Sequence, residues 1–135
     1  MKTKADLVKG WLRKAESDLA NSRLCLLSGQ ALDTACFHTQ PGAEKCLKAY
    51  LIAHETDFPF HHNLEKLIGL CAQGDPTFLE LKPLGETLTP YAVEMRYDDD
   101  FWPPVETVQE ALETALAIKC FVAARLPIHM KPEGF

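Results

Sequence analysis

Apolar residues recur at three- and four-residue steps over several stretches of the chain, which is the spacing of one face of an α-helix. The longest such stretch covers residues 31–54, and we interpret it as the helix around which the rest of the fold is arranged. Pro41 lies inside it and lacks an amide hydrogen, so we expect a kink between residues 37 and 41 or a helix restart there. The apolar stripe of this helix comprises Leu32, Cys36, Ala43, Cys46, Leu47, Tyr50 and Leu51.

The stretches on either side of this central helix have the same spacing. Residues 4–28 predict a first long helix, and the turn at Gly29 and Gln30 is so short that the two helices have to lie antiparallel as a hairpin. On the other side, Asn63 is a good N-cap and is expected to open a short helix over residues 64–72.

Glycine and proline divide the second half of the chain. Gly74 can close the short helix, Asp75 can cap the next one, and Pro76 fits its first position. Residues 78–96 keep the helical spacing but include two prolines, so we expect a bent or two-piece helix there. These prolines are Pro83 and Pro90.

The last third of the chain predicts a non-helical connector over residues 97–104, with the sequence YDDDFWPP, and a last long helix over residues 105–126. Residues 127–135 are expected to form a frayed tail. Because no segment alternates as a strand does, we predict an all-α fold, an antiparallel up-and-down helical bundle of four long helices plus one short helix. We expect one domain over residues 1–135, with its core at about residues 4–126.

The composition favours a soluble protein with a hydrophobic core and argues against a membrane protein or a small disulfide-stabilised one. Hydrophobic residues make up 47% of the chain, which is enough for a core without disulfides or a structural metal. No apolar run reaches the roughly 18 residues that a membrane span needs, so we expect a soluble, cytoplasmic protein that does not bind membranes. The cysteines include no C-x-x-C pair, and we interpret them as reduced core residues. They are Cys25, Cys36, Cys46, Cys71 and Cys120.

The net charge of −5 argues against indiscriminate binding of nucleic acid, but the charge is unevenly distributed. Residues 1–23 hold six basic and three acidic side chains, a balance of +3, so the remainder carries −8. A basic first helix on an acidic body could meet a phosphate backbone or an acidic partner protein. The alternative is an ordinary solvated face with mixed charge.

Three places in the sequence are chemically capable, although the standard phosphate-cradle, nucleophile-elbow, zinc-protease and calcium-loop motifs are all absent. The first is Gln40, Glu44 and Lys48, which follow one another at four-residue steps and therefore lie on one helix face. They are either part of a functional site or an exposed ion pair that supports the helix.

The second place is His61, His62 and Asn63, where an imidazole could cap the short helix or titrate near neutral pH. Neighbouring histidines in a loop point apart, so we expect no metal there. The third place is Arg96 with Tyr97, because an arginine at a helix end can pair with a carboxylate or a phosphate. The carboxylates that follow it, Asp98, Asp99 and Asp100, could instead neutralise it.

Three segments in this order resemble the HEPN family: FHTQPGAEKCLKAYL at residues 37–51, HNLEKLIGL at 62–70 and YAVEMRY at 91–97. HEPN domains are small α-helical domains of prokaryotes and higher eukaryotes that are commonly discussed as nucleotide-binding. The resemblance covers the chain from about Trp11 to Leu126. It implies a bundle of four to five helices that forms a homodimer, often encoded beside a minimal nucleotidyltransferase in a toxin–antitoxin arrangement.

The resemblance also implies that many relatives cut RNA, with an arginine and a later histidine that are separated by four to six residues, and with the two copies facing one another across the dimer. Counting from Arg96, that histidine would fall at Phe101, Trp102 or Pro103, and none of these side chains can transfer a proton. The carboxylates after Arg96 would also repel an RNA backbone. His62 and Tyr97 match the HxL and RY positions of the branch without the nuclease histidine.

Large apolar side chains in predicted loops are a second argument for a dimer, because a monomer rarely exposes so many. They could instead fold over the end of the bundle. These side chains are Phe58, Phe60, Phe101 and Trp102.

Three hypotheses about function remain. The first is a homodimeric HEPN-type module that binds a nucleotide-like ligand or a partner minimal nucleotidyltransferase and has no ribonuclease activity. The second is an RNA-cleaving enzyme that uses Arg96 with His62 as a substitute acid or base, and the third is a purely structural interaction module. We expect no cofactor and no metal. The predicted ligand-binding residues are Gln40, Glu44, Lys48, His62, Arg96 and Tyr97, and the candidates for catalysis are Arg96 and His62.

Overall fold

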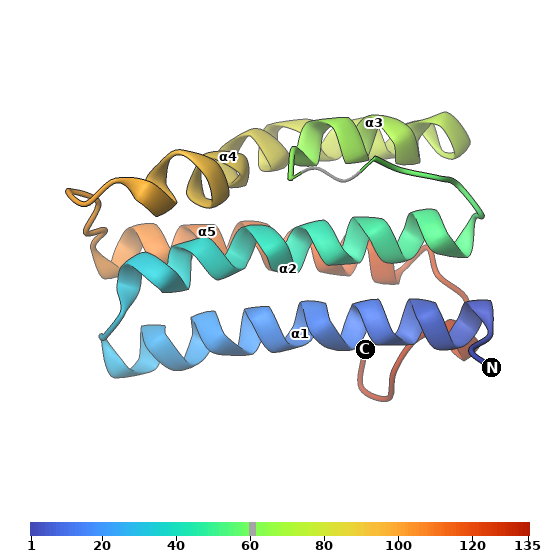
Figure 1. The fold of residues 1–135 in the computed structure, drawn as a ribbon, viewed down its shortest axis with the longest axis horizontal. Coiled ribbons are helices and arrows are strands. Elements are labelled where there is room, and N and C mark those ends of the chain that lie inside the picture. Colours follow the sequence, from blue (N-terminus) through green and yellow to red (C-terminus); the bar gives the residue numbers. More distant parts are fainter. Residues whose placement is uncertain (60–61) are drawn as a thin grey trace.

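The computed structural model describes residues 1–59 and 62–135, and within them all regular secondary structure is helical, without a strand (Figure 1). The all-α prediction is therefore confirmed. Phe60 and His61 lie outside the described residues. The helices are α1 (Lys4–Ser28), α2 (Leu32–Ala53), α3 (Leu64–Gly74), α4 (Lys82–Val93) and α5 (Val105–Ala123), with short 3₁₀ helices η1 (Pro76–Leu81), η2 (Met95–Tyr97) and η3 (Ile128–Met130).

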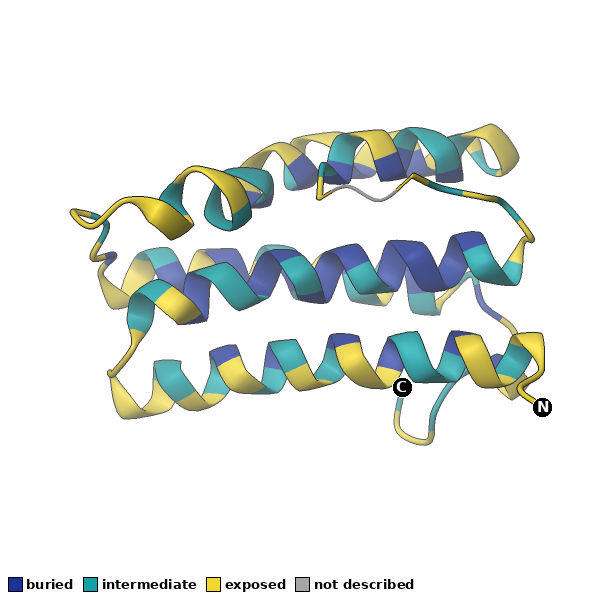
Figure 2. Cartoon of the chain, in the orientation of Figure 1, coloured by how far each residue is buried: buried dark blue, intermediate teal, exposed yellow. Residues whose placement is uncertain are grey.

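The central helix predicted over residues 31–54 is α2, and it is in contact with α1, α3, α4 and α5. Figure 2 shows it as the most deeply buried helix of the bundle. The helix is continuous through Pro41, so the expectation of a restart there is wrong. The apolar stripe predicted from the sequence lies in the core, apart from Leu32, which is only partly buried.

α1 and α2 form the antiparallel hairpin expected from the short turn between them (Figure 1). Their close approach depends on Gly42, because a Cβ built there would lie 2.7 Å from Leu19 Cδ2. The turn is made by Gly29 at φ 70° and Ala31 at φ 53°, both in the left-handed region. Gly29 adopts this conformation without strain, whereas a residue with a Cβ, such as Ala31, does so at a cost.

The predicted caps of the second half are confirmed. The Asn63 side chain accepts a hydrogen bond from the Lys66 amide at the start of α3. The Asp75 side chain accepts one from the Thr77 amide, and Pro76 opens η1 behind it. The predicted helix with two prolines is indeed in two pieces: the 3₁₀ helix η1 ends at Leu81, and α4 begins at Lys82.

The expectation of a frayed tail over residues 127–135 is wrong. After α5 the chain turns back along α1, where η3 buries Met130 against the core. The ammonium group of Lys131 donates to the carbonyl oxygen of Ala123 at 2.9 Å, which ties the segment to the end of α5. Apolar burial and this hydrogen bond together outweigh the chain entropy that would otherwise leave the segment loose.

The five cysteines are free thiols, but not all of them are core residues as predicted. Cys36, Cys46 and Cys71 are buried, Cys25 is half-buried, and Cys120 is exposed on α5. Within the described residues no helix is both long and apolar enough to cross a membrane.

Candidate functional site

A buried polar cluster lies at the middle of α2, and it contains the first group of residues singled out in the sequence. Gln40, Glu44 and Lys48 are only 0%, 5% and 3% exposed, so the interpretation as an exposed ion pair is wrong. The Lys48 ammonium lies 2.6 Å from Glu44 Oε2, and the Gln40 amide donates to Glu44 Oε1 at 3.1 Å. The four-residue spacing places these side chains on one face of α2, as expected.

His62 joins this cluster from the segment that leads into α3. Its Nδ1 lies 2.9 Å from Glu44 Oε1, and its carbonyl oxygen accepts a hydrogen bond from the Gln40 amide at 2.6 Å. His62 therefore contacts the polar face of α2 through both its ring and its backbone. The His62 ring itself remains 65% exposed at the rim of the cluster.

The Glu44 carboxylate is the electrostatic centre of the cluster. Burial raises the pKa of this carboxyl group, but hydrogen bonds from Lys48 and His62 outweigh burial and leave the pKa below its usual value. Glu44 is therefore ionised at neutral pH. On its other side, the Lys48 ammonium lies 5.6 Å from the ring centre of Trp11 and 5.7 Å from that of Phe58. The charged groups of the cluster thus pair with one another. Gln40 Oε1 is buried and accepts no hydrogen bond from any described residue.

Arg96 lies apart from this cluster, on η2 at the end of the bundle. Its guanidinium group lies over the ring of Phe37, 4.4 Å from the ring centre, and 5.4 Å from that of Tyr97. It forms no ion pair with any described residue, so the three carboxylates that follow it in the sequence do not neutralise it directly.

Arg96 faces a cleft of about 390 Å³, which we call the Arg96 cleft. Two carboxylates, Asp33 and Asp98, also line it, and so does His38 of α2. His38 Nδ1 lies 2.9 Å from Asp18 Oδ1 on α1. Sequence reasoning missed His38, because its carboxylate partner is 20 positions away and no local spacing connects the two. The remaining lining residues are Thr34, Phe37, Met95 and Phe101.

The predicted site residues thus fall into two groups. Gln40, Glu44, Lys48 and His62 come together, whereas Arg96 and Tyr97 do not join them. His62 lines a different cleft, between α3 and α4, together with Glu65, Glu86 and Glu94. Tyr97 is 78% exposed.

The three positions after Arg96 where a nuclease histidine would fall have structural roles. Phe101 packs against the core, with its ring 5.9 Å from that of Tyr91. The indole Nε1 of Trp102 donates to the carbonyl oxygen of Asp99 at 3.0 Å, and Pro103 is buried.

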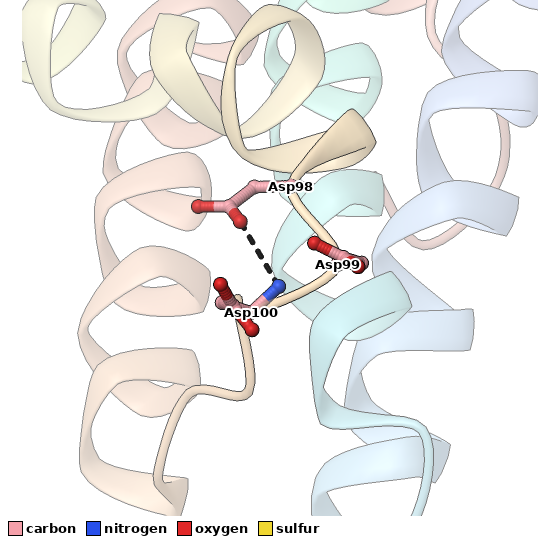
Figure 3. Close-up of side chains that lie close together, drawn as sticks. All are labelled: Asp98, Asp99 and Asp100. Atoms are coloured by element: carbon pink, nitrogen blue, oxygen red, sulfur yellow. Dashed lines mark hydrogen bonds between the residues drawn. The ribbon is translucent and has the colours of Figure 1, made fainter.

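Asp98, Asp99 and Asp100 lie close together in the connector between η2 and α5 (Figure 3). One carboxylate oxygen from each lies within 4.8 Å of the others, and all three residues are exposed. The amide of Asp100 donates to Asp98 Oδ1 at 2.9 Å, which is an ordinary turn within an acidic loop. The geometry would admit a cation, but solvated acidic loops have the same form, so we assign no metal to it.

The chain is similar to one known protein family and to solved structures. The family model described as the HEPN domain matches residues 8–125. The crystal structure of an archaeal HEPN homologue superposes with a TM-score of 0.70 at 23% identity, over 93% of this chain and 98% of that one. A protein from Thermus thermophilus gives a TM-score of 0.70 at 26% identity, over 88% and 98% of the two chains. No curated protein matches the chain significantly.

Proposed function

Because the chain belongs to the HEPN domain family, we propose that it is a homodimeric cytoplasmic binding module without ribonuclease activity, which binds a partner minimal nucleotidyltransferase or a nucleotide-like ligand. The observation that carries this proposal is which side chains follow Arg96 in the sequence and what they contact. The positions expected to hold a nuclease histidine are taken by Phe101, Trp102 and Pro103, and their side chains are used in packing and in a turn.

His62 is a poor replacement for that histidine. Its Nδ1 is held by the Glu44 carboxylate, and its ring lines a cleft other than that of Arg96. A general acid or base has to reach the proton that it transfers, directly or through one water. The two separate clefts therefore argue against Arg96 and His62 of one chain as a catalytic pair.

Charge and exposure at the Arg96 end of the molecule favour a protein partner over RNA. The Arg96 cleft contains one guanidinium and two carboxylates, so its balance is unfavourable to a phosphate backbone. Tyr97 and Trp102 beside it are 78% and 73% exposed. Arginine, tyrosine and tryptophan are the side chains that most often dominate the energy of protein–protein interfaces.

The test is to mix the purified protein with the minimal nucleotidyltransferase encoded nearest to its gene and to measure complex formation by size-exclusion chromatography with light scattering. We expect a complex that is weakened at least tenfold by Trp102→Ala or Arg96→Ala, since interface anchors of this kind contribute more than about 1.4 kcal/mol each. Leu79→Ala, at an exposed apolar residue on η1, is the matched control and should leave the complex intact. The proposal fails if no complex forms and neither ATP nor AMP shifts the melting temperature.

Fewer exposed apolar side chains support the proposed homodimer than the sequence predicted. Of the four aromatic residues expected in loops, Phe58 and Phe101 fold onto the core, and Phe60 lies outside the described residues. Trp102 remains exposed, and so do Leu24 and Leu27 near the end of α1. The end of α1 and the connector before α5 lie at the same end of the bundle (Figure 1). Light scattering on the protein alone should give twice the mass of 15.1 kDa, and a monomer would remove this part of the proposal.

A second candidate function, RNA cleavage, is favoured by one observation. His38 lines the Arg96 cleft, and the Asp18 carboxylate holds its Nδ1, so that its Nε2 is free to exchange a proton when the ring is neutral. If this candidate is correct, total RNA is degraded by the wild-type protein and spared by Arg96→Ala and His38→Ala, whereas His62→Ala still cuts. Intact RNA in all incubations, with and without divalent metal, would support the binding module.

A further inference from the structure

A cleft of about 550 Å³, which we call the Trp11 cleft, opens between the first half of α1 and the middle of α2. Leu7, Gly10, Trp11 and Lys14 of α1 line it, together with Lys2 and with Lys45 of α2. The α1 residues follow one another at three- and four-residue steps, so they form a stripe beside the core stripe of the same helix. This volume is within the range of small-molecule sites.

The charge of the Trp11 cleft is opposite to that of the protein as a whole. It holds three lysines and one carboxylate, that of Asp6, in a chain of net charge −5. Asp6 is already bonded to the Thr3 amide in the capping box of α1. By contrast, the cleft at His62 is lined by three glutamates, and the Arg96 cleft holds two aspartates. Of these three clefts, the Trp11 cleft is the one that attracts an anion.

The lysines of this cleft differ in whether they already form an ion pair within the protein. Lys45 is paired with Asp18 of α1, so its charge is partly neutralised. Lys2 and Lys14 form no ion pair with any of the described residues and remain able to donate to a ligand. Two such ammonium groups near a third one suit a phosphate group, which offers several acceptor oxygens.

The rest of the Trp11 cleft suits a flat ring. The indole of Trp11 is fixed by packing against the core and by Lys48, whose ammonium lies 5.6 Å from the ring centre. A fixed indole is a platform on which a planar base can stack. Gly10 leaves room beside it, because a Cβ built there would meet no atom within 4 Å.

We propose that the Trp11 cleft binds a phosphate ester of a planar heterocycle, of the nucleoside monophosphate class, with the ring against Trp11 and the phosphate among Lys2, Lys14 and Lys45. The proposal names the site of the nucleotide-like ligand and in that respect rests on the proposed function. It does not depend on the partner surface at Arg96. It also gives a role to the basic first helix, which the Arg96 end of the molecule does not use.

The experiment uses tryptophan fluorescence of the full chain in a Trp102→Phe background. The chain has two tryptophans, so Trp11 is then the sole reporter. We expect AMP to quench its emission saturably, whereas adenosine and ribose 5-phosphate, which each lack one half of the ligand, should bind at least about tenfold more weakly. Equal affinity for ribose 5-phosphate and AMP would overturn the role given to Trp11, and the proposal with it.

Three variants locate the binding site. Gly10→Glu places a carboxylate in the cleft at a position with free space on a helix, and it should abolish quenching by AMP while the thermal melt stays cooperative. Lys14→Ala should weaken AMP binding about fivefold, the usual effect of one exposed ion pair. Lys82→Ala, an exposed lysine at the start of α4, is the matched control and should change nothing.

The outcomes separate this proposal from the function proposed above. If AMP binds and Gly10→Glu leaves its affinity unchanged while Arg96→Ala removes it, nucleotide binding stands and the Trp11 cleft is overturned as its site. If AMP, dAMP and GMP all fail to quench Trp11, the Trp11 cleft is again overturned, whereas the partner complex measured with Arg96→Ala and Trp102→Ala is tested separately.

Discussion

Replacing Lys48 by methionine removes the cationic partner of the buried Glu44 carboxylate, and the structure allows the cost to be worked out. The two side chains are 4% and 6% exposed, and their charged atoms lie 2.6 Å apart. Breaking a buried ion pair from one side usually costs about 3–5 kcal/mol, because the remaining charge loses its compensation in a medium of low polarity. Here His62 and Gln40 still donate to Glu44, so we expect the lower end, about 3 kcal/mol of unfolding free energy.

The pH dependence of this cost has a definite sign. In the wild type the pKa of Glu44 is lowered on folding, so its ionisation stabilises the protein above the unfolded pKa, and this contribution is lost as pH falls. Without Lys48, we expect burial to outweigh the remaining hydrogen bonds and to raise the pKa of Glu44. The variant then gains stability relative to the wild type as pH falls, because protonation removes the buried charge.

The assay is urea unfolding of the wild type, Lys48→Met and Lys48→Met/Glu44→Gln at pH 7 and pH 4.5, followed by circular dichroism. We expect the difference between wild type and Lys48→Met to be largest at pH 7 and to shrink at pH 4.5. The double variant carries no charge at either position and should recover about 2 kcal/mol relative to Lys48→Met at pH 7. A cost that is equal at both pH values, or a double variant no more stable than the single one, would refute this reasoning.

Three further predictions concern packing and thiol chemistry. Gly42→Ala should lower the unfolding free energy by about 1–3 kcal/mol, because the new methyl group meets Leu19. Gly69→Ala, where a Cβ would meet no atom within 4 Å, should instead raise it by about 0.5–1 kcal/mol. Urea melts of the two variants and the wild type test both values. Met130→Ala should cost about 2 kcal/mol by the same measurement, and a value near zero would mean that η3 does not pack as described. Burial raises the pKa of the Cys46 thiol to about 12, so a disulfide reagent at pH 8 should modify the exposed Cys120 within minutes and Cys46 only at the rate of unfolding, as peptide mapping will show.

The helices and their caps could be predicted because their causes are local. Asn63 and Asp75 cap helices through amides two or three positions away, and the spacing of apolar residues reports the core face of each helix directly. Proline inside a helix was harder to interpret. The helix at Pro41 is continuous, held on several sides by its neighbours, while the segment from Pro76 to Tyr97 breaks into pieces.

The candidate sites were only partly predictable, because their surroundings come from distant segments. Glu44 and Lys48 have the spacing of an exposed pair, but both are buried, and the partner of Glu44 from outside α2, His62, lies 18 positions later in the chain. The pairing of His38 with Asp18 and the free space beside Gly10 arise where α1 and α2 meet in the hairpin. The sequence shows the residues of such sites, but the geometry that gives them a role is tertiary.

The close approach at Gly42 sets how the molecule can change shape. Leu19 of α1 fills the notch that the missing side chain leaves on α2, so neither helix can slide along the other by a turn without first separating from it. The walls of the Trp11 cleft belong to this rigid pair and keep their distance. We therefore expect any rearrangement that accompanies a partner on the opposite side, where η1, α4 and η2 are short, interrupted pieces joined at Leu81 and Val93.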